Sequence, residues 1–220
     1  MGDSRSHWRA GAYALEHEIV VSGSAHTSAL HDLQWLPKQT DESISFYFDE
    51  PNGRLAKRGI LVSLYGLTSS PAFGLRLRLK EALGWNEGWR HGVSITMPVA
   101  SREATVVGDL RHFAGTYVAD SLARHVADLG AVSFRVSLAQ TRRRWLLRDA
   151  RSSEFVTLSQ DSVMFETSEA SVANDFVEVS TYEWPIRSSY LSERVRDTLQ
   201  AIDGRAVKSK IQWFQGRTSS

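Results

Sequence analysis

The alternation of cationic and apolar residues over residues 74–80 constrains the fold of this chain more than any other feature. The segment has the sequence Gly-Leu-Arg-Leu-Arg-Leu-Lys, and side chains on a strand alternate between its two faces. Arg76, Arg78 and Lys80 therefore share one face of an expected strand, while three leucines share the other. Three neighbouring cations repel one another, so their face meets either water or an anion. For one strand alone, a solvated outer face is the more common arrangement.

The same pattern recurs elsewhere in the sequence, and this recurrence favours an anion. Arg142 and Arg144 share a face of a second expected strand, and Lys208 and Lys210 share a face of a third. The sequence Leu-Glu-His-Glu-Ile-Val at residues 15–20 does the same with two carboxylates. A sheet whose polar faces turn inward around an anion would require such a set.

Composition excludes several classes of protein. The 26 basic and 25 acidic residues give a net charge of +1, which argues against general attraction to nucleic acid. The chain has no cysteine, which excludes disulfides and fits a reducing cytosol. No stretch approaches the roughly 20 apolar residues of a membrane span, and the start lacks the apolar core of a signal peptide. We therefore expect a cytoplasmic protein with neither nucleic acid nor membrane as a partner.

The order of expected elements predicts an α+β fold with an antiparallel sheet. Strands are expected at residues 16–22, 42–48, 60–67, 74–80, 91–97, 131–138, 141–149, 154–158, 176–182 and 207–214, and helices at 24–36, 102–129 and 188–202. Residues 162–174 are polar and predict a loop. So many strands with so few helices indicate a closed or nearly closed β-barrel with flanking helices. We expect one domain over residues 15–214, with flexible tails at 1–14 and 215–220.

These features, in this order, resemble the CYTH domain, also called the triphosphate tunnel metalloenzyme fold. Residues 47–60 have the sequence Tyr-Phe-Asp-Glu-Pro-Asn-Gly-Arg-Leu-Ala-Lys-Arg-Gly-Ile. This stretch is similar to the family's Tyr-Phe-Asp-Thr-Pro, followed by a basic run and Gly-Ile. Family-like features continue in order from Leu79-Lys80 through residues 141–145, the Glu154 and Glu178 strands, and Ser209-Lys210. The family contains inorganic triphosphatases, thiamine triphosphatases and class IV adenylyl cyclases.

The sequence also departs from the family pattern. The family opens with Glu-x-Glu-x-Lys, but Val20 stands where the lysine belongs. Two same-face arginines usually follow Gly-Ile, and here Ser63 and Tyr65 take their places. An Arg-x-Glu-x-Glu pattern is expected next, but Gly92 and Ser94 replace its acids. Charges are therefore missing on both the phosphate side and the metal side.

The resemblance implies a tunnel that binds a triphosphate-containing small molecule or polyphosphate together with Mg²⁺ or Mn²⁺. Arginine and lysine suit phosphate oxygens, and carboxylates suit these hard metal ions. The expected metal ligands are Glu16, Glu18, Glu154 and Glu178, of which Glu16 and Glu18 are also the expected catalytic residues. The expected phosphate ligands are Arg76, Arg78, Lys80, Arg142, Arg144 and Lys210. Arg76, Arg78 and Lys80 could supply the cations that Ser63 and Tyr65 do not.

Two functions remain open at this point. The first is a metal-dependent triphosphate hydrolase, and the second is a non-catalytic protein that holds a polyphosphate or phosphorylated ligand. The missing acids favour the second, because loss of a metal carboxylate harms turnover more than it harms attraction between cations and an anion. A cyclase ranks third, since nothing in the sequence marks a nucleobase pocket. The organic part of the substrate, the metal, homo-oligomer formation and the role of the 102–129 helix are left open.

Overall fold

The computed structural model of the chain describes residues 13–23, 36–67, 76–98, 129–182, 184–202 and 204–218. Its strands are β1 (Tyr13–Ser22), β2 (Leu36–Asp49), β3 (Ile60–Leu67), β4 (Arg76–Asn86), β5 (Trp89–Pro98), β6 (Ser133–Arg148), β7 (Phe155–Glu166), β8 (Ser171–Thr181) and β9 (Arg205–Val207). Its helical segments are η2 (Pro51–Gly53), α2 (Arg54–Lys57), α4 (Ser189–Gln200) and α5 (Lys210–Thr218). The helices expected at 24–36 and 102–129 lie almost wholly outside the described residues, as does most of the expected tail at 1–14.

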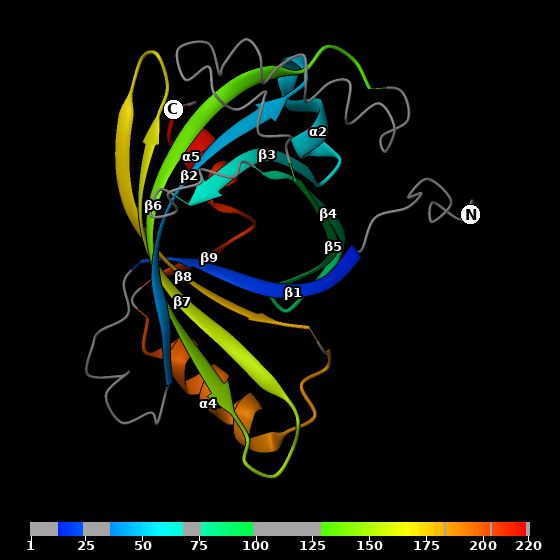
Figure 1. Cartoon of the computed structure of the whole chain (residues 1–220), viewed down its shortest axis with the longest axis vertical. Helices are drawn as coiled ribbons and strands as arrows, with labels where there is room; N and C mark the ends of the chain where they lie inside the picture. Colours follow the sequence, from blue (N-terminus) through cyan, green and yellow to red (C-terminus); the bar gives the residue numbers. More distant parts are fainter. Residues whose placement is uncertain are drawn as a thin grey trace.

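Strand β1 closes the sheet into a barrel. The strands follow the order β5-β4-β3-β2-β6-β7-β8-β1-β9, and β1 pairs with β5 as well. His17, for example, lies opposite His91 of β5 on one side and Thr181 of β8 on the other. All these pairings are antiparallel, so β1 to β8 form a closed antiparallel barrel (Figure 1), and β9 attaches to β1. The predicted fold class is therefore confirmed.

The outer face of this barrel is apolar on two sides. Leu77 and Leu79 of β4 pack outward with Val62 and Leu64 of β3 against Leu55 of α2. On the other side, α4 covers the outer faces of β1, β7 and β8 (Figure 1), with its buried residues Leu191 and Val195 in the same apolar cluster as residues of those strands. Because side chains alternate, burial of the apolar faces outward directs the polar faces of the same strands into the barrel.

Helix α5 fills one end of the barrel interior. Ile211 and Phe214 pack among inward-facing residues of β6, β7 and β8, including Phe165 and Phe176. The strand expected at 207–214 is therefore wrong beyond Val207. The physical reason is that Ile211 and Phe214 are three residues apart, which places both on one face of a helix.

The structure differs from the expectation in two further places. Residues 131–149, expected as two strands, contain one strand of 16 residues, β6. The expected loop at 162–174 is instead mostly strand, because β7 continues to Glu166 and β8 begins at Ser171. Val163 and Phe165 alternate there with exposed residues, a two-residue period that the polar composition obscured. Helix α4 confirms the expectation at 188–202, and Ser188 caps it by accepting a hydrogen bond from the Leu191 amide. Within the described residues, no helix has the length and apolar character needed to cross a bilayer.

Candidate functional site

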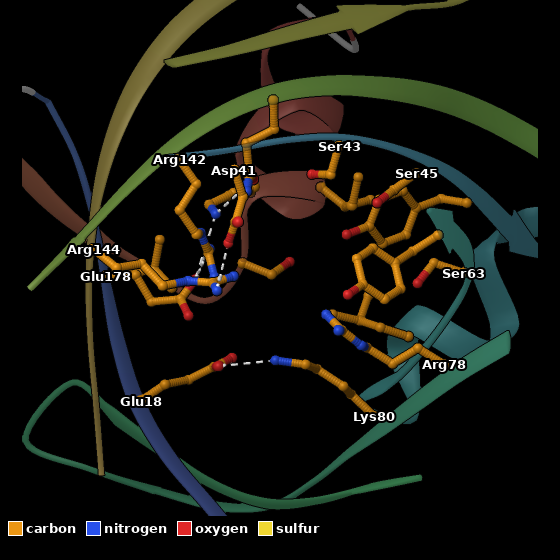
Figure 2. Close-up of a pocket in the computed structure, with 18 residues that line it drawn as sticks. Glu18, Asp41, Ser43, Ser45, Ser63, Arg78, Lys80, Arg142, Arg144 and Glu178 are labelled. Atoms are coloured by element: carbon orange, nitrogen blue, oxygen red, sulfur yellow. Dashed lines mark hydrogen bonds and ion pairs between the residues drawn. The ribbon is translucent and has the colours of Figure 1, made fainter. Parts of the chain in front are cut away.

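Polar side chains from seven strands and α5 surround two adjoining cavities inside the barrel. Their volumes are about 130 and 280 Å³. Seven residues line both of them, namely Glu18, Tyr65, Arg78, Lys80, Arg142, Arg144 and Glu178. Figure 2 shows cations and carboxylates from opposite walls pointing into this shared space. The two cavities therefore form one continuous polar site.

Lys80 and Arg90 bind the two carboxylates of β1. Lys80 Nζ lies 3.0 Å from an oxygen of Glu16 and 3.0 Å from an oxygen of Glu18. Arg90 Nε donates to Glu18 at 2.8 Å, its Nη2 donates to Glu16 at 3.2 Å, and Ser94 Oγ donates to Glu16 at 2.6 Å. Burial opposes the charged form of Lys80, but Glu18 and Glu16 outweigh it and raise the pKa of the lysine. Burial likewise raises the pKa of Glu16, but Lys80 and Ser94 outweigh it, and the net pKa is lowered.

Gly92 makes room for Arg90 in this first cluster. A Cβ atom at residue 92 would lie 2.5 Å from Arg90 Nη1 and 2.3 Å from the carbonyl oxygen of Glu81. Neither approach is compatible with a side chain. The absence of a side chain at Gly92 is thus what allows the Arg90 guanidinium to reach Glu16 and Glu18.

A second cluster joins β6, β7, β8 and α5. Arg142 donates from Nε and Nη2 to the two oxygens of Asp161 at 2.7 Å each, and from Nη2 to Glu178 at 2.9 Å. Lys210 Nζ bonds to Asp161, to Gln140 Oε1 at 3.1 Å and to Glu178 at 3.4 Å. Asp161 is completely buried. Burial opposes the charged form of Glu178, but Arg142 and Lys210 outweigh it and hold the pKa of this carboxyl well below its usual range.

The remaining wall is formed by hydroxyl groups and one stacked arginine. Ser43, Ser45 and Ser63 line the cavity from β2 and β3, and Figure 2 shows them opposite Arg142 and Glu178. The Arg78 guanidinium lies 4.2 Å from the centroid of the Tyr65 ring. Next to the second cluster, Arg144 Nη1 is 2.6 Å from Asp41 Oδ2.

Comparison with known proteins shows what this architecture resembles. No family model matches the sequence, and no curated protein sequence matches it. Solved structures do match, at low identity. HpAC1 from Hippeastrum, an adenylyl cyclase candidate with a dominant triphosphatase activity, is 16% identical over 91% of this chain and 95% of its own, with a TM-score of 0.62. An adenylate cyclase candidate from Bacillus halodurans is 15% identical over 92% and 98%, with a TM-score of 0.59.

A protein from Pyrococcus horikoshii has the same architecture, at 13% identity over 91% of this chain and 99% of its own, with a TM-score of 0.56. Each of the three alignments covers nearly the whole of this chain and nearly the whole of the matched protein. The chain has the fold of these three proteins. In this chain the closed barrel surrounds a polar interior, named the tunnel, which contains both cavities. At these identities the likeness concerns the fold, so the chemistry of the tunnel depends on its own residues.

The tunnel contains most of the residues that the sequence singled out. Eight of the ten line one or both cavities, namely Glu16, Glu18, Arg78, Lys80, Arg142, Arg144, Glu178 and Lys210. Arg78 lies directly opposite Ser63 in the β3–β4 pairing, so it points into the tunnel beside a residue that replaces a family arginine. Arg143 points out of the barrel and is exposed, as alternation predicts.

Two predicted residues lie outside the tunnel. Arg76 is exposed at the first position of β4 and does not line either cavity. Glu154 precedes β7, and its two oxygens accept hydrogen bonds from the backbone amides of Arg187 and Ser188, at 2.8 and 2.7 Å. Its carboxylate therefore supports the start of α4, and the structure does not bring it to the other acids.

Sequence reasoning missed several polar residues of the site, among them Asp161, Asp41, Arg90 and Ser94. Asp161 belongs to β7, and only the β6–β7 pairing reveals that it faces Arg142. Asp41 faces Arg142 in the β2–β6 pairing in the same way, before the point where strand β2 was expected to begin. Arg90 and Ser94 lie in the segment where the resemblance implies acids, and their role depends on contacts with Glu16 and Glu18 of β1. Strand pairing, which the sequence alone did not specify, was the missing information.

The carboxylates of Glu16 and Glu18 suit a hard divalent ion, which would compete with Lys80 for their oxygens. Mg²⁺ takes one or two protein carboxylates when the substrate supplies phosphate oxygens, and Glu16 and Glu18 offer such a pair on one strand. Both are already bonded to Lys80 and Arg90. Among the described residues, no group of three or more His, Cys, Asp or Glu side chains is arranged to hold a metal ion. A divalent ion would therefore need phosphate oxygens to complete its ligands.

Proposed function

We propose that the protein is a metal-dependent hydrolase of inorganic triphosphate or an organic triphosphate. The observation that carries this proposal is the convergence of Arg78, Lys80, Arg142, Arg144 and Lys210, from β4, β6 and α5, on the two adjoining cavities beside Glu16 and Glu18. A triphosphate needs such a set because its negative charges must be neutralised together. The dominant triphosphatase activity of the Hippeastrum protein, which has the same fold, supports the same assignment.

The tunnel residues would act chiefly by position and charge, which is most of the catalytic work in phosphoryl transfer. Arg78 and Arg142 would hold the phosphate chain, and their guanidinium groups would stabilise the charge that develops on its oxygens. The barrel wall would exclude bulk water from around the phosphate chain of the substrate. Glu16 and Glu18 would hold Mg²⁺ or Mn²⁺, which when bound polarises the phosphoryl oxygens and orients water.

A second candidate function is binding of a polyphosphate or phosphorylated ligand without turnover. The observation that favours it is that the carboxylates of Glu16, Glu18 and Glu178 are each bonded to two cationic side chains. A metal must compete for these oxygens, whereas attraction between the cations and an anion needs no metal. The two functions share the tunnel and differ only in whether phosphate is released.

One assay separates the two functions. Phosphate release from inorganic triphosphate with Mg²⁺ or Mn²⁺, lost in Glu16→Ala, supports the hydrolase. Calorimetric binding of triphosphate without release supports the binding protein. Glu154→Ala serves as the matched control, since Glu154 is a strand-end glutamate outside the tunnel and its loss should leave release unchanged. Absence of release would overturn the hydrolase, absence of both binding and release would overturn both functions, and release that persists in Glu16→Ala would overturn the role of Glu16.

A further inference from the structure

Asp161 is bonded to Arg142 and Lys210, the two tunnel cations that are best suited to bind phosphate. It is completely buried behind the cavity, where it accepts two hydrogen bonds from Arg142 and one from Lys210. A bidentate arginine is the arrangement that also recognises phosphate oxygens. Asp161 therefore holds Arg142 in the contact that a phosphate group would otherwise make, and it holds Lys210 as well.

Most of the tunnel charge is neutralised in this way. Among the described residues, the cations in or beside the tunnel are Arg78, Lys80, Arg90, Arg142, Arg144 and Lys210, and the carboxylates paired with them are Glu16, Glu18, Asp41, Asp161 and Glu178. The six cations thus exceed the five carboxylates by one. Arg78, stacked on Tyr65, is the tunnel cation for which the described residues provide no carboxylate partner.

This balance makes the tunnel less attractive to a highly charged ligand than its six cations alone would make it. A triphosphate carries several negative charges, each of which is repelled by the buried carboxylates at short range. In a partly buried site, such interactions are screened much less than at the surface. A singly phosphorylated group meets the same carboxylates with less charge, so it loses less binding energy.

Resting on the proposed function of the tunnel in phosphate binding, we propose that Asp161 is a specificity-determining residue that limits the negative charge of the ligand. It does so as an internal counter-ion of Arg142 and Lys210. Asp41 has the same role for Arg144, which is more exposed, with 31% of its side chain accessible. Removal of either charge makes the tunnel more positive and shifts its preference towards longer phosphate chains.

The test compares the affinity for inorganic triphosphate and for orthophosphate in Asp161→Asn and wild type. Binding is measured by calorimetry in EDTA, so that neither metal binding nor turnover contributes. We expect Asp161→Asn to bind triphosphate about tenfold or more tightly, with a gain of about threefold or less for orthophosphate, because the electrostatic effect scales with ligand charge. An equal gain for both ligands, no gain, or weaker triphosphate binding would overturn the proposal, since Asp161 would then serve only to position Arg142.

The matched control is Asp175→Asn. Asp175 lies opposite Ser162 on β7, one position from the Asp161–Phe176 pair, so its side chain is on the other face of the sheet. This variant changes the net charge equally and should alter triphosphate affinity by less than about twofold. A gain as large as that of Asp161→Asn would attribute the effect to overall charge and overturn the proposal.

Asp41→Asn keeps the proposal testable should Asp161→Asn fail to fold. It should also tighten triphosphate binding more than orthophosphate binding, by a smaller factor, and the absence of that selectivity would count against the proposal. Should wild type bind no triphosphate, a variant that gains binding supports the proposal and a variant that does not overturns it. Failure of the proposed hydrolase is a separate result, because it appears as absence of phosphate release in the presence of metal.

Discussion

Lys80 reaches across the barrel interior from β4 to Glu18 of β1, with its Nζ atom 3.0 Å from Oε2 of the carboxylate (Figure 2). It makes the same contact with Glu16. The family signature places a lysine on the same strand as the two glutamates, where this chain has Val20. Lys80 is therefore a cation from another strand that lies against the acid pair.

Lys80→Met should strengthen binding of Mn²⁺ to the tunnel. Loss of the ammonium group frees oxygens of Glu16 and Glu18 and removes a positive charge that repels the ion, so we expect about a tenfold gain in affinity. Electron paramagnetic resonance of free Mn²⁺ measures this directly. Lys57→Met removes an exposed lysine of α2 and should leave Mn²⁺ binding unchanged. Equal Mn²⁺ affinities in Lys80→Met and wild type would show that Lys80 and metal do not compete.

Arg78→Ala should weaken triphosphate binding far more than Arg76→Ala. Both arginines belong to β4 and share a face by alternation, but Arg78 lines the tunnel and Arg76 is exposed at the strand start. Loss of hydrogen bonds to a charged group costs about 1.5–3 kcal/mol, or roughly 10–100-fold in affinity. Calorimetric titration with inorganic triphosphate gives both values. Similar losses in the two variants would mean that phosphate contacts the outside of the tunnel mouth.

Glu178→Gln should make the free energy of unfolding fall less steeply as the pH is lowered into the acidic range. Arg142 and Lys210 hold the pKa of Glu178 well below 4.5 despite its burial, so the carboxylate stabilises the folded state above that pH. This contribution is lost as pH falls from 4.5 towards the folded-state pKa. Urea unfolding at a series of pH values measures the free energy of unfolding. Glu166→Gln, at an exposed site on β7, should retain the wild-type pH dependence, and a matching dependence in Glu178→Gln would contradict the ion-pair assignment.

Glu154→Ala should destabilise the protein without affecting the tunnel. Its carboxylate accepts hydrogen bonds from two backbone amides just before α4, so we expect a loss of about 1 kcal/mol in the free energy of unfolding. Thermal or urea unfolding measures the loss, and triphosphate affinity should equal that of wild type. Glu193→Ala, on the exposed side of α4, should have little effect on either. Loss of triphosphate binding in Glu154→Ala would indicate that Glu154 belongs to the phosphate-binding site.

The number of expected strands predicted the barrel, and the resemblance added candidates such as Glu178. The alternation of polar and apolar residues predicted which side chains share a face. It placed Arg142 and Arg144 together and Arg143 outside, because a strand has a fixed two-residue period. It did not reveal Asp161, whose partner Arg142 is identified only by the pairing of β7 with β6. It also failed for Lys210, which occupies its expected place in the tunnel from a helix rather than a strand. Local pattern determines which face a side chain takes, whereas contacts across the barrel depend on register.

The position of α5 has a consequence for synthesis of the chain on the ribosome. All eight barrel strands precede Lys210 in sequence, so the sheet emerges before the lysine that bonds to Asp161 and Glu178. Until α5 is translated, those two acids share Arg142 alone, and the end of the barrel that Phe214 fills stays open to water. Completion of the interior therefore requires the last helix of the chain, and a nascent chain halted before Lys210 would have five tunnel cations against five carboxylates, without the excess of one cation.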